Sequence, residues 1–145
     1  MFPTFKNGEY ILTNLITLRL SPLKRGDVIV FIAPTDSTKD FIKRIIGLPG
    51  EKVYLHDGYV YVNDAKLNES AYLGPDIRSY AGAYLKEDSP IIIPQGEYFV
   101  MGDNRPESSD SREFGPIHVE SVIGKSFFVY WPANVMRVVT NPYSK

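Results

Sequence analysis

The chain has 145 residues, of which 43% are hydrophobic and 23% are charged, a composition that suits one domain with a hydrophobic core. Its formal net charge of −1 argues against a protein that binds nucleic acid through bulk positive charge. There is no Cys, and His56 and His118 alone leave little for a zinc site or a Ser-His-Asp triad. No apolar run approaches the roughly 20 residues that a membrane span needs, and no signal peptide is predicted at Met1.

Short apolar runs with alternating side chains dominate the sequence and predict β-strands. In chain order, the predicted strands are Tyr10–Leu12, Val28–Phe31, Phe41–Ile46, Lys52–Leu55, Tyr59–Val62, Ile91–Ile93, Tyr98–Met101 and Phe127–Tyr130. Asp57-Gly58 lies between two of them and predicts a two-residue hairpin turn, because both positions of such a turn require positive φ. Asn63-Asp64 predicts a second turn.

Helix signals are few. Residues 13–20 fit a short helix or a strand equally well, since they are rich in Thr and Ile. Residues 116–121, just after Gly115, predict one helical turn. Residues 71–90 mix Tyr, Gly and charges without a period, and we expect an insertion or a long loop there. The whole chain is therefore predicted to form a single, mostly antiparallel β domain.

Two adjacent cations, Lys43 and Arg44, interrupt an otherwise apolar predicted strand. Side chains alternate along a strand, so the two point to opposite faces and need separate explanations. One explanation is an edge strand that carries protective charges. The other is that apolar neighbours desolvate Lys43 and lower its pKa, so that a neutral amine can accept a proton from a hydroxyl. Arg44 does not deprotonate, and its natural role is to hold a carboxylate such as that of Asp103.

A polar loop, residues 103–112, follows the predicted strand that ends at Met101. A solvated surface loop is the simplest interpretation. A calcium-binding loop fits poorly, because Arg105 and Glu107 fall at the third and fifth ligand positions and no Gly stands at the sixth. A nucleic-acid contact is disfavoured since the acidic residues of the loop cancel the basic ones.

The same loop also suits a site that orients a catalytic lysine. A neutral amine needs partners that fix its lone pair, and the hydroxyl of Ser108 or of Ser111 is suited to this. Asp110 and Arg112 are two residues apart and are expected to pair with each other or with their neighbours. Such a pair would make the loop rigid.

Together these segments resemble the type I signal peptidases, which are membrane-bound endopeptidases with a Ser-Lys dyad. The resemblance is carried by three stretches in order, "RGDVIVF", "FIKRIIGLPGEKV" and "GDNRPESSDSREFG", and by "MFPTF" at the start. It extends from Met1 to about Pro132. It implies a β-rich catalytic domain with a variable antiparallel insertion, for which residues 54–93 fit a short version. It implies no metal and no cofactor.

By this resemblance, Lys43 matches the general base and Ser108 matches the hydroxyl that hydrogen-bonds to it. The supporting residues that the resemblance implies are Arg44, Asp103, Asp110 and Arg112, and the substrate-binding residues are Met1, Phe2 and Pro3. Glu107 departs from the Asn that is common in the family, a difference expected to matter little.

The family's nucleophile is the Ser immediately before the Met-x-Pro-Thr motif, which here is Met1–Thr4. We therefore expect a fragment that lacks the serine, one oxyanion-hole residue and the membrane anchor, and that is inactive as given. One alternative is a noncatalytic homologue that binds preproteins or a partner peptidase. Another is a self-cleaving repressor with a related dyad and fold, but a DNA-binding domain and an internal cleavage site are missing.

The resemblance also implies substrates and a location. The substrates are secretory preproteins with small residues before the cut, which bind as an extended strand at a sheet edge. The location is the cell membrane, with the catalytic domain on its extracytoplasmic face. Apolar residues at one end of the domain are either core or an exposed patch that touches the membrane surface. They are Phe2, Phe5, Ile11, Leu12, Leu15, Ile16, Leu18, Leu20, Phe127, Phe128 and Trp131.

Overall fold

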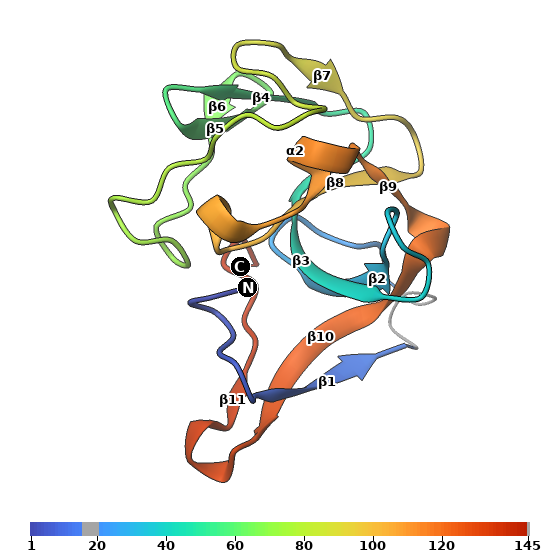
Figure 1. The fold of residues 1–145 in the computed structure, drawn as a ribbon, viewed down its shortest axis with the longest axis vertical. Helices are drawn as coiled ribbons and strands as arrows, with labels where there is room; N and C mark the ends of the chain where they lie inside the picture. The colour runs from blue at the N-terminus through green and yellow to red at the C-terminus, as the bar shows by residue number, and fades with distance from the viewer. Residues whose placement is uncertain (16–20, 145) are drawn as a thin grey trace.

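The computed structural model describes residues 1–15 and 21–144. It contains a seven-stranded antiparallel sheet in which six strands follow the order β1-β10-β2-β3-β8-β9, while β11 pairs with β10 (Figure 1). These strands are β1 Tyr10–Asn14, β2 Val28–Ile32, β3 Asp40–Gly47, β8 Glu97–Met101, β9 Ile117–His118, β10 Val122–Trp131 and β11 Arg137–Val138. The prediction of a mostly antiparallel β fold is confirmed.

A smaller, four-stranded sheet has the order β6-β5-β4-β7. Its strands are β4 Lys52–His56, β5 Tyr59–Val62, β6 Ala65–Lys66 and β7 Ile91–Ile92. Both predicted turns are present, since Asp57 and Gly58 have φ of 50° and 76°, and Asn63 and Asp64 have φ of 50° and 66°. Apart from the first two residues of β4, this sheet falls within residues 54–93, the range predicted to be the variable insertion of the family, a role that stays a prediction.

The helical segments are short and were largely missed by the sequence patterns. They are α2 Ser111–Phe114 and the 3-10 turns η1 Arg105–Glu107, η2 Val119–Ser121 and η3 Ala133–Val135. The turn predicted over residues 116–121 is half right, because β9 occupies its first part and η2 its second. Of the ambiguous segment 13–20, Thr13 and Asn14 belong to β1, and residues 16–20 lie outside the described part of the chain.

The last long strand, β10, is ten residues rather than the predicted four. Gly124, Lys125 and Ser126 interrupt its apolar run, so the pattern did not show the full length. Gly124 has a packing role, because a Cβ there would stand 2.6 Å from a Thr13 side-chain carbon and 2.8 Å from the Asn14 carbonyl oxygen of β1. The glycine thus allows β1 to approach β10 closely.

Strand β3 separates two parts of the core. Ile46 belongs to a buried cluster that reaches into the small sheet, whereas Ile45 belongs to a second cluster with Ile29 and Phe31. The strand is not an edge strand overall, because β2 pairs with residues 40–44 and β8 pairs with it from Arg44 onward. Before Arg44, however, only β2 pairs with β3, so this half of the strand has one free edge within the described residues.

Candidate active site

Lys43 lies on β3 at the end of this free edge. Its side chain is partly buried, and its Nζ lies 5.3 Å from the centroid of the Phe41 ring, two residues earlier on the same face. Burial lowers the pKa of Lys43 below its usual value of 10.5, the carboxylates of Asp110 and Asp103 oppose the shift, and Arg112 adds to it. The expected desolvated amine is therefore present.

Ser108 lies next to this amine. A Cβ placed on Gly102 would stand 2.1 Å from Ser108 Oγ and 3.5 Å from Lys43 Nζ, so both groups crowd the same glycine. Ser108 Oγ is buried and has no hydrogen-bond partner among the residues that the structure describes. The other candidate hydroxyl is occupied, because Ser111 Oγ accepts a 2.9 Å hydrogen bond from the backbone N–H of Val100.

Arg44 points to the other face of β3 and is fully paired. Its Nε and Nη2 donate to the two oxygens of Asp103 at 2.9 and 2.8 Å, and its Nη1 donates to the carbonyl of Gly26 at 2.8 Å. Both side chains are buried. Thr4 also donates to Asp103, which connects the N-terminal segment to this pair. The predicted Arg44–Asp103 contact is confirmed.

Asp110 and Arg112 form the second buried pair, as predicted. Arg112 donates through Nε and Nη2 to the two Asp110 oxygens at 2.9 and 2.8 Å, and through Nη2 to the carbonyl of Arg105 at 2.8 Å. Asp110 also accepts from the Gly102 N–H at 3.0 Å and caps the N-terminus of α2. Burial alone would raise the pKa of Asp110, but Arg112, the Gly102 N–H and the side chain of Ser108 outweigh it, and the pKa is lowered.

The first residues of the chain lie beside Lys43. The amino group of Met1 has a lowered pKa, first because of burial and then because of the charge on Lys43. Met1 packs against a core cluster that includes Phe5 and Ile42, while Phe2 is 58% exposed. Pro3 lines a cavity of about 540 Å³. The structure thus brings Met1, Lys43 and Ser108 to one place.

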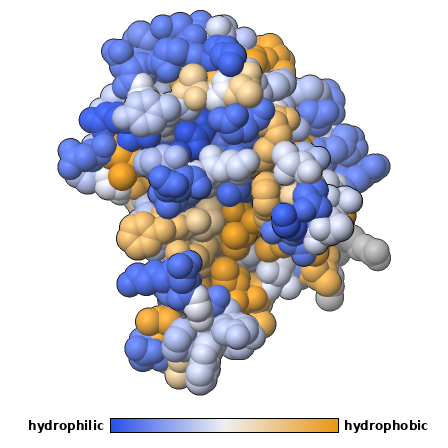
Figure 2. Space-filling view, in the orientation of Figure 1, coloured by the Kyte–Doolittle hydropathy of each residue, from blue (hydrophilic) through white to orange (hydrophobic). Residues whose placement is uncertain are grey.

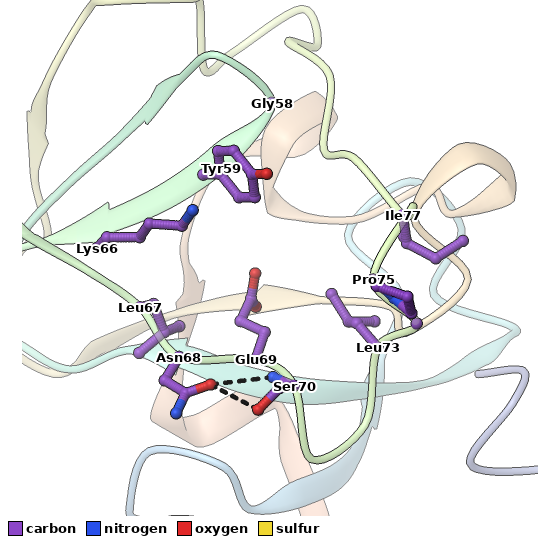
Figure 3. A pocket seen from close by; sticks show the side chains of 11 residues that line it. Gly58, Tyr59, Lys66, Leu67, Asn68, Glu69, Ser70, Leu73, Pro75 and Ile77 are labelled. Carbon is purple, nitrogen blue, oxygen red and sulfur yellow. Dashed lines mark hydrogen bonds between the residues drawn. The ribbon is translucent and has the colours of Figure 1, made fainter.

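The sequence patterns missed three residues that contact Arg44 or Arg105. Thr4 was part of the quoted motif, but no role was assigned to it. Glu69 pairs with Arg105, and the ring of Tyr72 lies 4.2 Å from the Arg44 guanidinium carbon. Tyr72 lies in the segment 71–90 that has no period, Glu69 lies just before it, and no sequence signal pointed to a role of either residue in the site. Glu69 also borders a cavity of about 490 Å³, whose lining comes from residues 58–77 (Figure 3).

The comparisons with known proteins identify the family of the chain. The family described as signal peptidase, peptidase S26, matches residues 1–131. The chain belongs to this family, and it is the body of a type I signal peptidase.

Individual relatives show the same relationship. Signal peptidase IB of Staphylococcus aureus (strain MRSA252) is 37% identical, over 98% of this chain and 78% of that protein. Signal peptidase I of Bacillus caldolyticus is 36% identical, over 91% of this chain and 75% of that protein. The crystal structure of a signal peptidase I from Enterococcus faecalis V583 has a TM-score of 0.60 and 32% identity, covering 72% of this chain and 97% of that one.

Proposed function

We propose that Lys43 is the general base of a Ser-Lys dyad, and that Ser108 orients its amine. The observation that carries this proposal is the juxtaposition of a desolvated Lys43, the buried hydroxyl of Ser108 and the amino group of Met1. A lowered pKa increases the fraction of neutral amine near pH 7, which is the form that accepts a proton. Asp110–Arg112 and Arg44–Asp103 hold the surrounding loop and strand in place.

The nucleophile of the proposed reaction is a serine joined to the amino group of Met1. Lys43 takes the proton from this hydroxyl, and the oxygen attacks the scissile carbonyl carbon. The protonated Lys43 then gives its proton to the leaving amine as the peptide C–N bond breaks. In the second half, Lys43 deprotonates a water molecule, which hydrolyses the acyl-enzyme and frees the serine. Without that serine the chain is expected to be inactive.

The substrate is a secretory preprotein, bound as an extended strand. Residues 40–43 of β3 have a free edge beside the dyad, which supports strand addition there. The amino group of Met1 interacts with the charge of Lys43, and Met1, Phe2 and Pro3 are proposed to contact the substrate residues next to the cleaved bond. Small substrate side chains just before the cleaved peptide bond would fit a binding site that lies directly against the sheet.

Membrane contact is proposed for the end of the domain formed by β1, β10 and β11. Large apolar side chains are exposed there, and Figure 2 shows apolar surface in this region of the molecule. The exposed residues are Tyr10, Leu12, Leu15, Phe127, Tyr130, Trp131 and Val138, whereas Phe5 is buried. No helix among residues 1–15 and 21–144 is long and apolar enough to cross a bilayer. An upstream anchor and an extracytoplasmic catalytic domain complete the proposal.

The test uses the protein extended at Met1 by a serine and the residues upstream of it. This protein is expected to cleave a preprotein at the end of its signal peptide, and Lys43→Ala is expected to lower kcat by about 10³-fold or more because it removes the proposed general base. The matched control is Lys52→Ala, which removes a lysine of the small sheet and leaves cleavage intact. Cleavage that survives Lys43→Ala would refute the dyad, and no cleavage by the extended protein would favour a noncatalytic, preprotein-binding homologue.

A further inference from the structure

Arg105 is a buried cation in the loop that carries Ser108. Its side chain has 0% exposure. Its Nε donates to the carbonyl of Gly102 at 3.1 Å, and its Nη1 donates to Ser79 Oγ at 2.6 Å and to Glu69 at 3.0 Å. Nη2 donates to the second oxygen of Glu69, so the pair is bidentate. Arg105 therefore holds Gly102, the residue that Ser108 and Lys43 both crowd.

Glu69 belongs to the irregular segment between β6 and β7, far along the chain from this loop. Its side chain is 11% exposed, and Figure 3 shows it directed into the 490 Å³ cavity. Removing one partner of a buried ion pair leaves an uncompensated charge, which is strongly unfavourable. Without Glu69, the buried Arg105 would have to move toward other acceptors, and the loop would move with it.

Tyr72 extends the same contact to the second arginine. Its hydroxyl donates to Glu69 at 2.8 Å and lies 3.0 Å from the hydroxyl of Tyr143 near the C-terminus. Its ring lies 4.2 Å from the guanidinium carbon of Arg44, a cation–π contact in a buried place. One short segment thus touches Arg105 beside Ser108 and Arg44 beside Lys43.

We infer that Glu69 and Tyr72 are positioning residues for the dyad: Glu69 fixes the Ser108 loop through Arg105, and Tyr72 fixes the Lys43 strand through Arg44. The inference rests on the proposed roles of Lys43 and Ser108. It gives the segment between the small-sheet strands a role in catalysis, because its two residues hold both the general base Lys43 and Ser108, the residue that orients the amine of Lys43. Misplacement of reacting groups by about 1 Å can cost on the order of 10²-fold in rate.

The experiment compares Glu69→Gln with Glu51→Gln in the serine-containing protein. Glu51 is a matched control, since it pairs with Arg25 at 2.6 Å and has 17% exposure, yet it contacts neither the Ser108 loop nor Lys43. Glu69→Gln is expected to lower kcat at least tenfold with KM changed less than twofold. It is also expected to move the acid limb of the pH–rate profile to higher pH, because a loosened loop lets water reach Lys43.

Glu51→Gln is expected to lower the melting temperature but to leave kcat and the acid limb unchanged. A Glu69→Gln protein that is less stable but has the wild-type kcat and pH profile would overturn the inference, since a structural role alone would do that. If Glu69→Gln does not fold, Tyr72→Leu decides: it removes both the ring that contacts Arg44 and the hydroxyl that contacts Glu69, and a kcat within twofold of wild type would overturn the inference. Lys43→Ala, measured alongside, separates this failure from failure of the dyad, because only the latter leaves Lys43→Ala active.

Discussion

Lys43 and Arg44 are neighbours on β3, yet the two faces of the strand hold their positive charges differently. On one face, four hydrogen bonds from Arg44 to Asp103, Gly26 and Thr4 compensate the buried guanidinium. On the other face, the amine of Lys43 is desolvated and the nearest hydroxyl, that of Ser108, has no partner among the described residues. The paired guanidinium of Arg44 therefore has a structural role, whereas the poorly compensated amine of Lys43 is suited to proton transfer.

The two faces of β3 are expected to affect different properties of the protein, namely stability on the Arg44 face and activity on the Lys43 face. Substitutions on the Arg44 face are expected to lower the free energy of unfolding, because they leave a buried charge unpaired. Substitutions on the Lys43 face are expected to lower activity with little loss of stability, and one of them is expected to raise stability. Active sites commonly carry such a cost, since groups placed for reaction are not placed for the greatest stability.

The largest effect on stability is expected from Asp103→Asn. The substitution removes the charge that pairs with Arg44 and should lower the free energy of unfolding by about 3–5 kcal/mol, the usual cost of breaking a buried pair. Urea denaturation measures it. Asp64→Asn, at the exposed ion pair with Lys52, is the control and should change stability little. Equal effects of the two substitutions would contradict the structural role of the Arg44 face.

Two serines close in the sequence are expected to differ: substitution of Ser108 should mainly lower activity, and substitution of Ser111 should mainly lower stability. Ser108→Ala should lower kcat by about 10–100-fold, the range of a mispositioned general base, with a smaller change in melting temperature than Ser111→Ala because its Oγ makes no well-formed hydrogen bond among the described residues. Ser111→Ala should lower the free energy of unfolding by about 1 kcal/mol, since the buried Val100 N–H loses its acceptor, and should affect kcat less. The reverse pattern would assign the positioning role to Ser111 instead.

The smallest effect is a gain in stability from Lys43→Met, which has similar length and no charge. The folded pKa of Lys43 lies below its usual 10.5, so the unfolded chain binds more protons between these two values. The loss of stability caused by burying the protonated amine is complete below the folded pKa and disappears as the pH rises toward 10.5. Lys43→Met should therefore raise the free energy of unfolding by on the order of 1 kcal/mol at neutral pH. Equal or lower stability in urea denaturation would contradict the desolvation of Lys43.

Local signals predicted much of the fold and of the site. Short-range alternation placed Lys43 and Arg44 on opposite faces of one strand, and the Asp57-Gly58 pair predicted a tight turn that has the required positive φ at both positions. The short spacing of Asp110 and Arg112 predicted their pairing, because residues two apart in a turn can reach each other. These features depend on neighbours in the sequence, which a single chain reveals.

Most long-range contacts were not predictable in the same way, although that of Arg44 with Asp103 was predicted. The bond between Glu69 and Arg105 joins residues 36 positions apart, and nothing in the sequence around Glu69 indicates its partner. The length of β10 was also hidden, because Gly124 weakens the strand pattern although it is needed for the close approach of β1. Such contacts are set by the packing of distant elements against each other.

The central claim is that the amine of Lys43 is easily deprotonated, and an NMR titration of its Nζ in the folded protein tests this most directly. A pKa clearly below 10.5 is expected, together with a kcat/KM that rises with pH through the same value in the serine-containing protein. A Lys43 pKa at or above 10.5, as for a lysine in water, would contradict the account.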